Sequence, residues 1–236
     1  FSNFLHKSSL IWDGDWRPEG GGFKFANGNV FVNGIGTWIE SDKKKDQLLA
    51  WGLQGGVKVP LGDAMKLTAG ASYYQLDTQG SGTFHGGGTD FFGNSYDPAT
   101  NTYLYDYRLF ELFTDLNFDL GNRPVKIYGD YVKNQDADKY DTGYQFGFQY
   151  GKAANKGQWQ VGYVYEKLEA DAVFGLLTDS DFGGGGTDSK GHIFKASYAL
   201  AKHANFDLTY FINKSGIRSG NSIDFKRLQV DLAFKY

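Results

Sequence analysis

Three aspartates flank a run of glycines and could together hold a metal ion. Asp179 and Asp181 stand two positions apart before the glycines at 183–186, and Asp188 follows them. Carboxylates at positions i and i+2 on a flexible loop can share a Ca²⁺ ion. The EF-hand pattern is absent, however, and one such loop is not a repeat array. Calcium binding is therefore an alternative to an ordinary surface loop, and we expect no metal or other cofactor.

A serine–histidine pair would be the other source of chemistry. The sequence has four histidines, His6, His85, His192 and His203, and Ser189 stands near His192. No nucleophile-elbow motif surrounds either member of that pair. We therefore expect no enzyme and assign no catalytic residue.

The pentapeptide Gly-Gly-Gly-Thr-Asp occurs twice, at 86–90 and at 184–188. A phosphate-binding loop would need glycines that lead into Gly-Lys-Ser/Thr between a strand and a helix. Neither copy has that order, and the flanking residues of the two copies differ. We interpret both copies as parts of long loops, in which glycine permits backbone angles that other residues resist.

The elements that position these loops are strands, because apolar and polar residues alternate along most of the chain. In Tyr144–Tyr150, aromatic residues alternate with Gln or Gly, and 228–236 repeats the pattern. Such runs are typical of strands with one apolar and one polar face, whereas helical spacing is not sustained anywhere. We predict strands at 21–26, 30–40, 47–60, 64–76, 103–120, 124–134, 142–152, 158–168, 191–200, 205–213 and 223–236.

Short and long connections alternate between these strands. Long polar stretches cover 41–46, 77–101, 134–141, 169–190 and 214–222, and tight turns separate them. Alternate connections of an antiparallel meander lie at the same end, so one end should carry every long loop. Most of the strands reach the about 9–11 residues that a tilted membrane-spanning strand needs.

Composition narrows the class of protein further. The 236 residues suffice for one large all-β domain, 1–236, or for two small ones. The absence of cysteine excludes a disulfide framework, an iron–sulfur cluster and a thiol nucleophile. The net charge of −3 gives no reason to expect nucleic acid as a partner. No run of about 18 apolar residues predicts a transmembrane helix, and no signal peptide opens the sequence, which suits a cytosolic protein or a mature or truncated chain.

Alternating strands fit either a soluble sandwich or barrel, or a membrane barrel. A soluble core would favour Val, Ile and Leu. Here the apolar faces are rich in aromatic residues near the strand ends, and the opposite faces carry charges at mid-strand, which favours a membrane barrel with aromatic girdles. The girdle candidates are Trp38, Trp51, Tyr73, Tyr131, Trp159, Tyr210 and Phe234.

Two longer stretches carry a family resemblance. They are Trp12–Gly20 (WDGDWRPEG) and 168–188, and the similarity continues through Tyr128–Asn134 and the strand after Gly191-His192. These stretches resemble the putative porin family of Gram-negative bacterial outer membranes. The resemblance implies a transmembrane antiparallel up-and-down β-barrel without general catalytic residues. It also implies further strands before the first stretch, hence about 16 strands when complete against 11–12 visible here. Residues 3–12 could supply the twelfth.

The resemblance further implies a place and a task for the chain. We expect an integral protein of the bacterial outer membrane, with its long loops extracellular, its outer face in contact with lipid, and small hydrophilic solutes or ions passing by passive diffusion. Porins are often trimers, so a homotrimer is a candidate assembly. A closed or plugged barrel that serves as an anchor or interaction platform is the alternative. The last residue, Tyr236, resembles the C-terminal aromatic signal of such barrels.

If the aromatic and aliphatic positions face lipid, the opposite positions line the pore. These candidates are Lys58, Lys66, Glu111, Asp115, Lys126, Asp130, Glu166, Lys195, Asp207, Arg227 and Asp231. Their nearly balanced charge predicts an ion-paired wall rather than strong selectivity. At the mouth, Asp179, Asp181 and Asp188 would mildly enrich cations. The loops 77–101 and 169–190 are long enough to fold inward and narrow the pore, the second by way of its Gly-Gly-Gly-Thr-Asp copy. Their apolar anchors would be Tyr73, Tyr74, Phe84, Phe91, Phe92 and Phe174.

Overall fold

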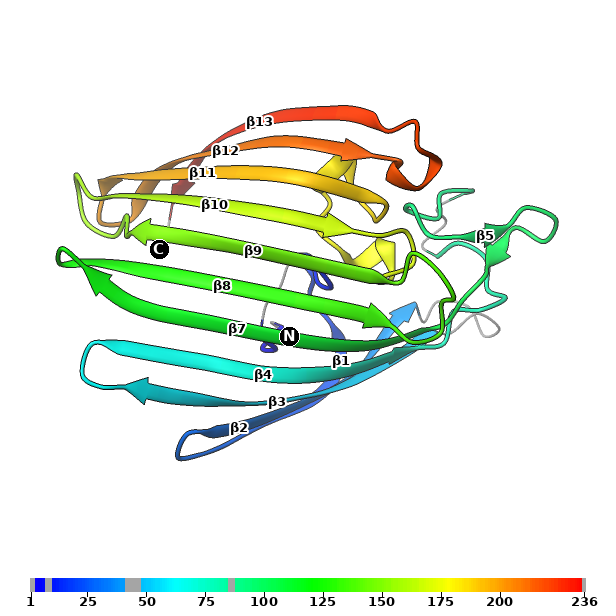
Figure 1. Ribbon diagram of the computed structural model, residues 1–236, viewed down its shortest axis with the longest axis horizontal. Helices are drawn as coiled ribbons and strands as arrows, with labels where there is room; N and C mark the ends of the chain where they lie inside the picture. The colour runs from blue at the N-terminus through cyan, green and yellow to red at the C-terminus, as the bar shows by residue number, and fades with distance from the viewer. Residues whose placement is uncertain (1–2, 7–9, 41–47, 85–87, 235–236) are drawn as a thin grey trace.

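A computed structural model describes residues 3–6, 10–40, 48–84 and 88–234. Its main element is an antiparallel sheet of eleven strands (Figure 1), in which each strand pairs with its neighbours in chain order except that β4 pairs with β7. The strands are β1 (Glu19–Asn27), β2 (Val30–Glu40), β3 (Leu48–Leu61), β4 (Met65–Leu76), β7 (Tyr107–Leu120), β8 (Arg123–Asn134), β9 (Thr142–Gly151), β10 (Trp159–Leu168), β11 (Ser189–Ala201), β12 (Ala204–Ser215) and β13 (Ile223–Phe234).

The long connections carry the remaining elements. A hairpin of two short strands, β5 (Tyr96–Asp97) and β6 (Thr102–Tyr103), lies between β4 and β7. Three short 3-10 helices are η1 (Gly175–Leu177) and η2 (Phe182–Gly184), between β10 and β11, and η3 (Ile217–Ser219), between β12 and β13. Within the described ranges, no helix has the length and apolar character needed to cross a membrane.

The main sheet confirms the strands expected from alternation, and short and long connections alternate as predicted. Two details differ. The strand expected at 103–120 begins at Tyr107, because Tyr103 pairs with Tyr96 in the small hairpin instead. Residues 3–6 and 10–12 form no strand; Leu10 and Trp12 are buried against other residues, so the twelfth strand proposed for 3–12 is wrong.

The two faces of the sheet differ in chemistry. The sheet is strongly curved, with residues 3–6 and 10–18 and the loop 169–188 on its concave side (Figure 1). All seven girdle candidates lie at convex-facing positions, and convex side chains such as Trp38, Phe146 and Leu228 are exposed. Because cross-strand partners share a face, the register carries this apolar convex face from β1 to β13.

The curved sheet is not closed within the described residues. Strands β1 and β13 are its two edges, and each pairs with one neighbour only. All nine residues of β1 are exposed. The structure therefore shows an open, curved, all-β sheet.

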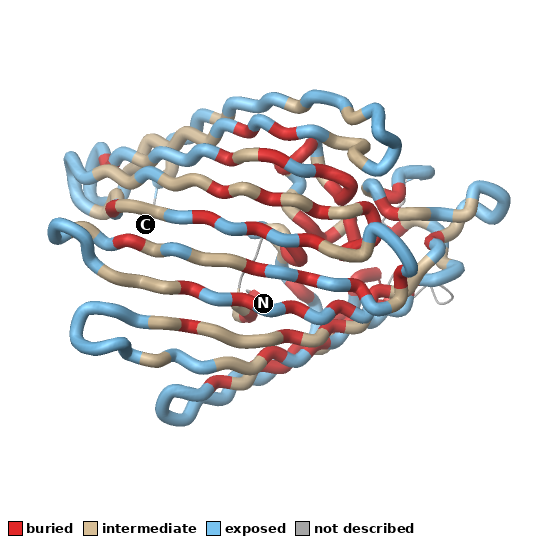
Figure 2. The backbone as a smooth tube through the Cα atoms, in the orientation of Figure 1, coloured by how far each residue is buried: buried red, intermediate tan, exposed pale blue. Residues whose placement is uncertain are grey.

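The buried residues concentrate at one end of the concave side, the end of the long loops (Figure 2). One apolar cluster joins the sheet to the segment before β1 and to the loops 77–106 and 169–188. Its largest members, Trp12, Tyr74, Tyr103, Tyr107 and Phe174, come from five different parts of the chain. A smaller cluster places Phe182 of η2 against Ile193 and Phe211 of the sheet. The loops thus form a packed body inside the curve at this end.

Candidate functional site

All eleven pore-lining candidates lie on the concave face. Each pairs across the strands with residues that point to this face, and the buried side chains of the sheet lie on the same face. Their surroundings differ with position along the strands. Toward the tight turns, Lys58 and Lys66 are exposed to a cavity. Toward the long loops, Glu111 and Glu166 are almost completely buried, at 0% and 1% exposure. That these residues line a conducting pore stays a prediction.

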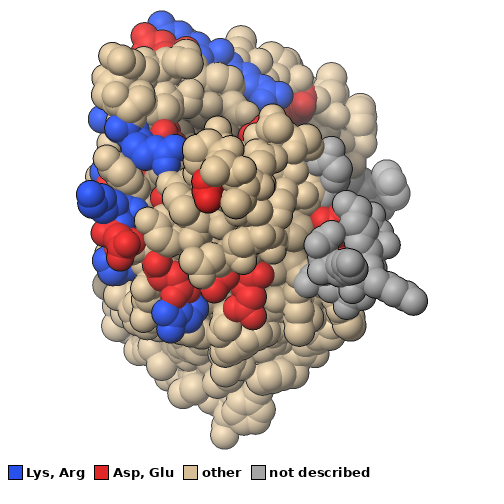
Figure 3. All heavy atoms as spheres, turned by 90° about the vertical axis from the view of Figure 1, so that its right-hand side faces the viewer, with Lys and Arg blue, Asp and Glu red and all other residues tan. Residues whose placement is uncertain are grey.

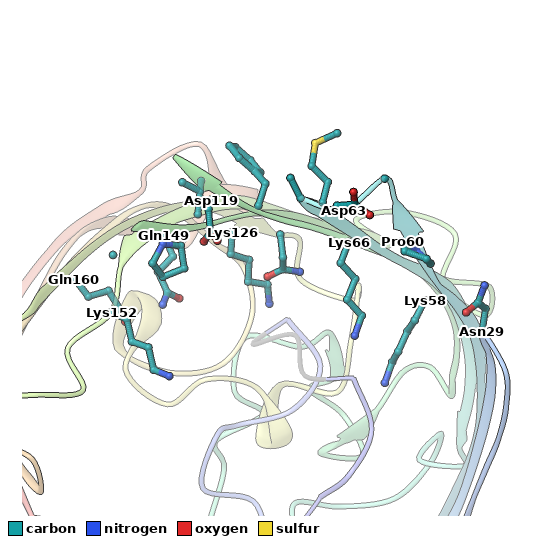
Figure 4. Close-up of a pocket in the computed structure, with 18 of the residues that line it drawn as sticks. Asn29, Lys58, Pro60, Asp63, Lys66, Asp119, Lys126, Gln149, Lys152 and Gln160 are labelled. Atoms are coloured by element: carbon teal, nitrogen blue, oxygen red, sulfur yellow. The ribbon is translucent and has the colours of Figure 1, made fainter. Parts of the chain in front are cut away.

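The cavity at the turn end has a volume of about 850 Å³ and a lining rich in lysine. Lys58, Lys66, Lys126 and Lys152 extend from the sheet into the concave side (Figure 4). The alternation of the sequence predicted the first three as inward-facing. It missed Lys152, which follows the last residue of β9 and belongs to a turn, where strand parity no longer applies. Asp63 and Asp119 also line this space, so its four lysines outnumber its two aspartates and the lining carries excess positive charge.

One of these lysines is neutralised locally. Lys126 Nζ lies 3.0 Å from Asp115 Oδ1, and the other carboxylate oxygen of Asp115 lies 3.8 Å from His6 Nε2. The His6 ring stacks on Phe113 at 4.1 Å between ring centroids. Burial lowers the pKa of His6, and the nearby Asp115 carboxylate only partly opposes this effect. The pair therefore leaves Lys58, Lys66 and Lys152, together with Asp63 and Asp119, to set the charge of the cavity.

Deeper in the concave face, hydrogen bonds run across neighbouring strands. Asn33 Nδ2 donates to Gln54 Oε1 at 3.2 Å, Gln54 Nε2 donates to Ser72 Oγ at 3.1 Å, and Ser72 Oγ donates to Glu111 Oε2 at 2.5 Å. The backbone amide of His6 also donates to Gln54 Oε1, at 2.7 Å. This row fixes buried polar side chains across β2, β3, β4 and β7 and ties the segment before β1 to the wall.

The loops at the opposite end are joined by buried hydrogen bonds. Asn94 Nδ2 donates to the carbonyl oxygens of Ala170 and Val173, and Asp171 accepts from the backbone amide and the hydroxyl of Ser95. Arg218, in the loop after β12, donates to Ser95 Oγ at 2.5 Å. Three loops that are far apart in sequence are therefore held as one body, and the prediction that loops fold inward agrees with this arrangement.

The apolar anchors expected for these loops divide between the two faces. Phe84, Phe91, Tyr74 and Phe174 are buried in the cluster at the loop end. Tyr73 instead lies on the convex face, 5.6 Å from Trp51 between ring centroids, so its assignment as a loop anchor is wrong. Adjacent residues of a strand point to opposite faces, which is why Tyr73 and Tyr74 separate.

The three mouth aspartates do not form a shared metal site. Asp181 pairs with Arg227 Nη1 at 2.7 Å and accepts from Gln229 Nε2, whereas Asp188 Oδ1 accepts from the backbone amide of Arg218. Among the described residues, no group of three His, Cys, Asp or Glu side chains could hold a metal ion. Burial raises the pKa of Asp179 and of Asp188, and hydrogen bonds to backbone amides offset only part of that rise.

The second Gly-Gly-Gly-Thr-Asp copy is packed rather than free. Gly183–Gly186 all have positive φ angles, and a Cβ on Gly186 would overlap the carbonyl oxygen of Phe92. Thr187 donates its backbone amide to that same oxygen at 2.8 Å and its hydroxyl to Ala170 O at 2.7 Å. This copy therefore holds the two long loops in contact with each other. The first copy begins in residues 85–87, outside the described residues.

The serine–histidine pair does not form. Ser189 and His192 stand three positions apart on β11, so their side chains lie on opposite faces of the sheet. Ser189 is buried on the concave side, and His192 Nδ1 lies 2.8 Å from Tyr163 Oη on the convex side. Of the other histidines, His203 is exposed in a tight turn and His85 lies outside the described residues.

The loop end presents both signs of charge to solvent. Figure 3 looks onto this end and shows acidic side chains toward the middle and lower part of the face, with lysine and arginine along the left border. Two ion pairs contribute here, Arg108 with Asp136 and Lys133 with Asp141. Basic side chains thus offset part of the negative charge, and the surface at the loop end is less acidic than the number of aspartates in the long loops suggests.

The fold and these contacts define an all-β protein with an apolar outer face, a polar inner face and loops packed inside the curve. The chain belongs to the family described as putative porin, whose model matches residues 100–236, more than half of the sequence. The match covers β7 to β13 and the loop 169–188, and it confirms the resemblance carried by those stretches. A search of curated proteins finds no match. Membership supports a porin-like, non-enzymatic role at the level of the family.

Proposed function

We propose that the chain forms an outer-membrane β-barrel that passes small hydrophilic solutes or ions by passive diffusion. The carrying observation is the separation of its two faces: exposed apolar side chains on the convex face, and charged or amide side chains on the concave face. Family membership supports the same conclusion. The proposal includes closure of the sheet into a barrel, with the long loops outside the cell.

The convex face supports a lipid environment. Leu49, Trp51 and Leu53 alternate along β3 at 41–51% exposure, and Tyr144, Phe146 and Phe148 alternate along β9 at 37–52% exposure. Soluble monomers rarely expose contiguous apolar patches larger than a few hundred Å². Here the exposed apolar positions recur on every long strand, so hydrocarbon is a better solvent for this face than water.

The concave face supports passage of small polar solutes at the turn end, where the lysine cavity is open. At the loop end, the packed loops restrict the route. This restriction favours small solutes and also favours the second candidate function, a plugged barrel that serves as an anchor or interaction platform. The decisive difference is whether water and ions can cross between the loop body and the wall.

Conductance in planar bilayers tests the proposal. The full-length protein, folded in detergent and checked by heat-modifiable gel migration, should give discrete channel openings in KCl, and liposomes that contain it should take up small sugars. A folded protein that partitions with outer membranes yet gives neither conductance nor uptake would support the plugged barrel. Recovery in the soluble fraction, without heat-modifiable migration, would rule out both.

A further inference from the structure

The convex face carries a row of lysines at the loop end. Lys190 on β11 lies directly opposite Lys167 on β10 and directly opposite Lys214 on β12. Like charges opposite one another on paired strands destabilise a sheet. Three lysines in consecutive register positions therefore need negative charge nearby.

Among the described residues, carboxylates pair only with the two outer members of the row. Lys167 Nζ lies 2.7 Å from Glu169 Oε1, and Lys214 Nζ lies 2.7 Å from Asp224 Oδ1. In the part of the chain that the structure describes, neither Lys190 nor Lys226 forms an ion pair. Lys226 lies on β13, directly opposite Ile212 on β12. Both lysine side chains are exposed. The middle of the row is thus a positive site that the protein itself leaves open.

Two adjoining hollows lie next to this row of lysines. The first, of about 370 Å³, is lined by Lys190, Lys226 and the ion pair of Lys214 with Asp224, together with Tyr165 and His192. Two residues further along the strands, toward the turn end, lies a second hollow of about 480 Å³. Its convex-face lining is apolar: Phe194, Ala196, Leu208, Tyr210 and Leu228. A cationic rim therefore continues directly into an apolar groove.

We infer that this surface binds a lipid with a phosphorylated headgroup in the leaflet at the loop end. Lys190 and Lys226 contact the phosphate, and the apolar groove holds an acyl chain. Charge complementarity selects an anionic lipid, because a neutral lipid or a detergent would fill the groove without offsetting the lysines. The inference rests on the membrane placement of the proposed function but not on ion conduction.

Binding of lipid A, the diphosphorylated lipid anchor of the bacterial outer leaflet, tests the site. The full chain is folded in detergent, and bound lipid is measured by native mass spectrometry for lipid A and for its dephosphorylated form. Lys190→Gln combined with Lys226→Gln should weaken lipid A binding about tenfold or more, the effect of losing about 1.4 kcal/mol. The matched control is Lys156→Gln with Lys202→Gln, two exposed lysines at the turn end, which should bind as the wild type does.

Two further arms separate the alternatives. Lipid A should raise the unfolding temperature of the wild type more than dephosphorylated lipid does, and millimolar inorganic phosphate should not displace it. Equal binding of both lipids, or equal binding by the double variant and the wild type, overturns the inference, and so does displacement by free phosphate. Conductance is recorded on the same samples. Lipid binding without conductance would contradict the porin proposal alone, and conductance without phosphate-dependent binding would contradict the lipid site alone.

Discussion

The side-chain amide of Asn94 donates a hydrogen bond of 2.7 Å to the carbonyl oxygen of Ala170, 76 residues further along the chain. The same nitrogen reaches Val173 O at 2.9 Å, and the backbone amide of Gly175 donates to Asn94 Oδ1 at 2.8 Å. One buried side chain thus satisfies three backbone groups of the loop 169–188. Buried backbone groups without partners are costly, so the position of that loop depends on Asn94.

Replacing Asn94 by alanine should loosen the loop 169–188. The change removes the Asn94 partner from the buried carbonyl oxygen of Val173 and from the amide of Gly175, at about 1–3 kcal/mol each, whereas Ala170 O keeps the Thr187 hydroxyl. Hydrogen exchange of the amides of 169–188, measured in detergent, should accelerate by about tenfold or more. If the loop restricts the solute route, single-channel conductance should rise as well. Asn155→Ala, in an exposed turn at the other end, is the control, and equal exchange in both variants would contradict the role of Asn94.

Gly186 and Gly216 offer a matched pair of substitutions. Both have left-handed φ angles, +82° and +69°, so alanine costs backbone energy at either position, on the order of 1–3 kcal/mol. A Cβ at Gly186 would overlap the Phe92 carbonyl oxygen, whereas nothing lies within 4 Å of one at Gly216. Gly186→Ala should therefore lower the unfolding temperature in detergent clearly more than Gly216→Ala. Equal shifts would show that the Phe92 contact contributes no stability.

The strands and their faces could be predicted because alternation is a local property of the sequence. Tyr144–Tyr150 shows this most clearly: its aromatic residues face outward and its Gln and Gly residues inward, as their spacing indicates. The same parity placed every pore-lining candidate on the concave face. The turn positions could also be predicted, because Gly and Asn stand between the predicted strands. One example is Gly121-Asn122, where both residues have positive φ.

The packed interior could not be predicted in this way. Leu10, Ile11 and Trp12 show poor alternation because all three are buried inside the curve, where a segment has no lipid-facing side. Lys152 reaches the cavity from a turn, which parity does not describe. The contact of Asn94 with Ala170 joins residues that no local pattern relates. Each of these features depends on how distant segments meet, and only the folded chain brings them together.

Loop closure should strengthen as the pH falls from 7 toward 5. Burial raises the pKa of Asp171, Asp179 and Asp188 above the ordinary value of 3.8. Hydrogen bonds offset this only in part, as do Arg218 near Asp171 and Asp188 and Lys195 near Asp179. A carboxyl with a raised pKa stabilises the packed loop most when protonated, and that contribution is lost as the pH rises through the raised pKa. Exchange protection of 169–188, corrected for intrinsic rates, should therefore be greater at pH 5 than at pH 7.

The carboxyls of Asp13 and Glu169 have the opposite effect on loop stability, but only below the range of pH 5 to 7. The pKa values of Asp13 and Glu169 are lowered: burial raises each, but hydrogen bonds and, for Glu169, Lys167 outweigh it. Their contribution is lost only below their ordinary values of 3.8 and 4.5. Asp171→Asn should reduce the pH dependence, and Asp63→Asn, in an exposed turn, should leave it unchanged. Protection that decreases from pH 7 to pH 5 would show that burial does not control these carboxyls.

The lysine cavity should bias ion selectivity toward anions. Lys58 and Lys66 extend into it without ion pairs among the described residues, whereas Lys126 is paired with Asp115. Lys58→Gln combined with Lys66→Gln removes two positive charges from a confined space, so the local concentration of cations should rise. The permeability ratio of K⁺ to Cl⁻, from the reversal potential in a KCl gradient, should increase about threefold at 0.1 M salt.

Salt provides an internal check on that mechanism. The screening length falls from about 10 Å at 0.1 M to about 3 Å at 1 M, so the difference between wild type and variant should shrink at the higher concentration. Lys156→Gln, an exposed residue of the turn after β9 that does not line the cavity, should leave the ratio unchanged. If the double variant keeps the wild-type reversal potential at 0.1 M while still conducting, ions do not pass the lysines, and the solute route lies elsewhere on the concave face.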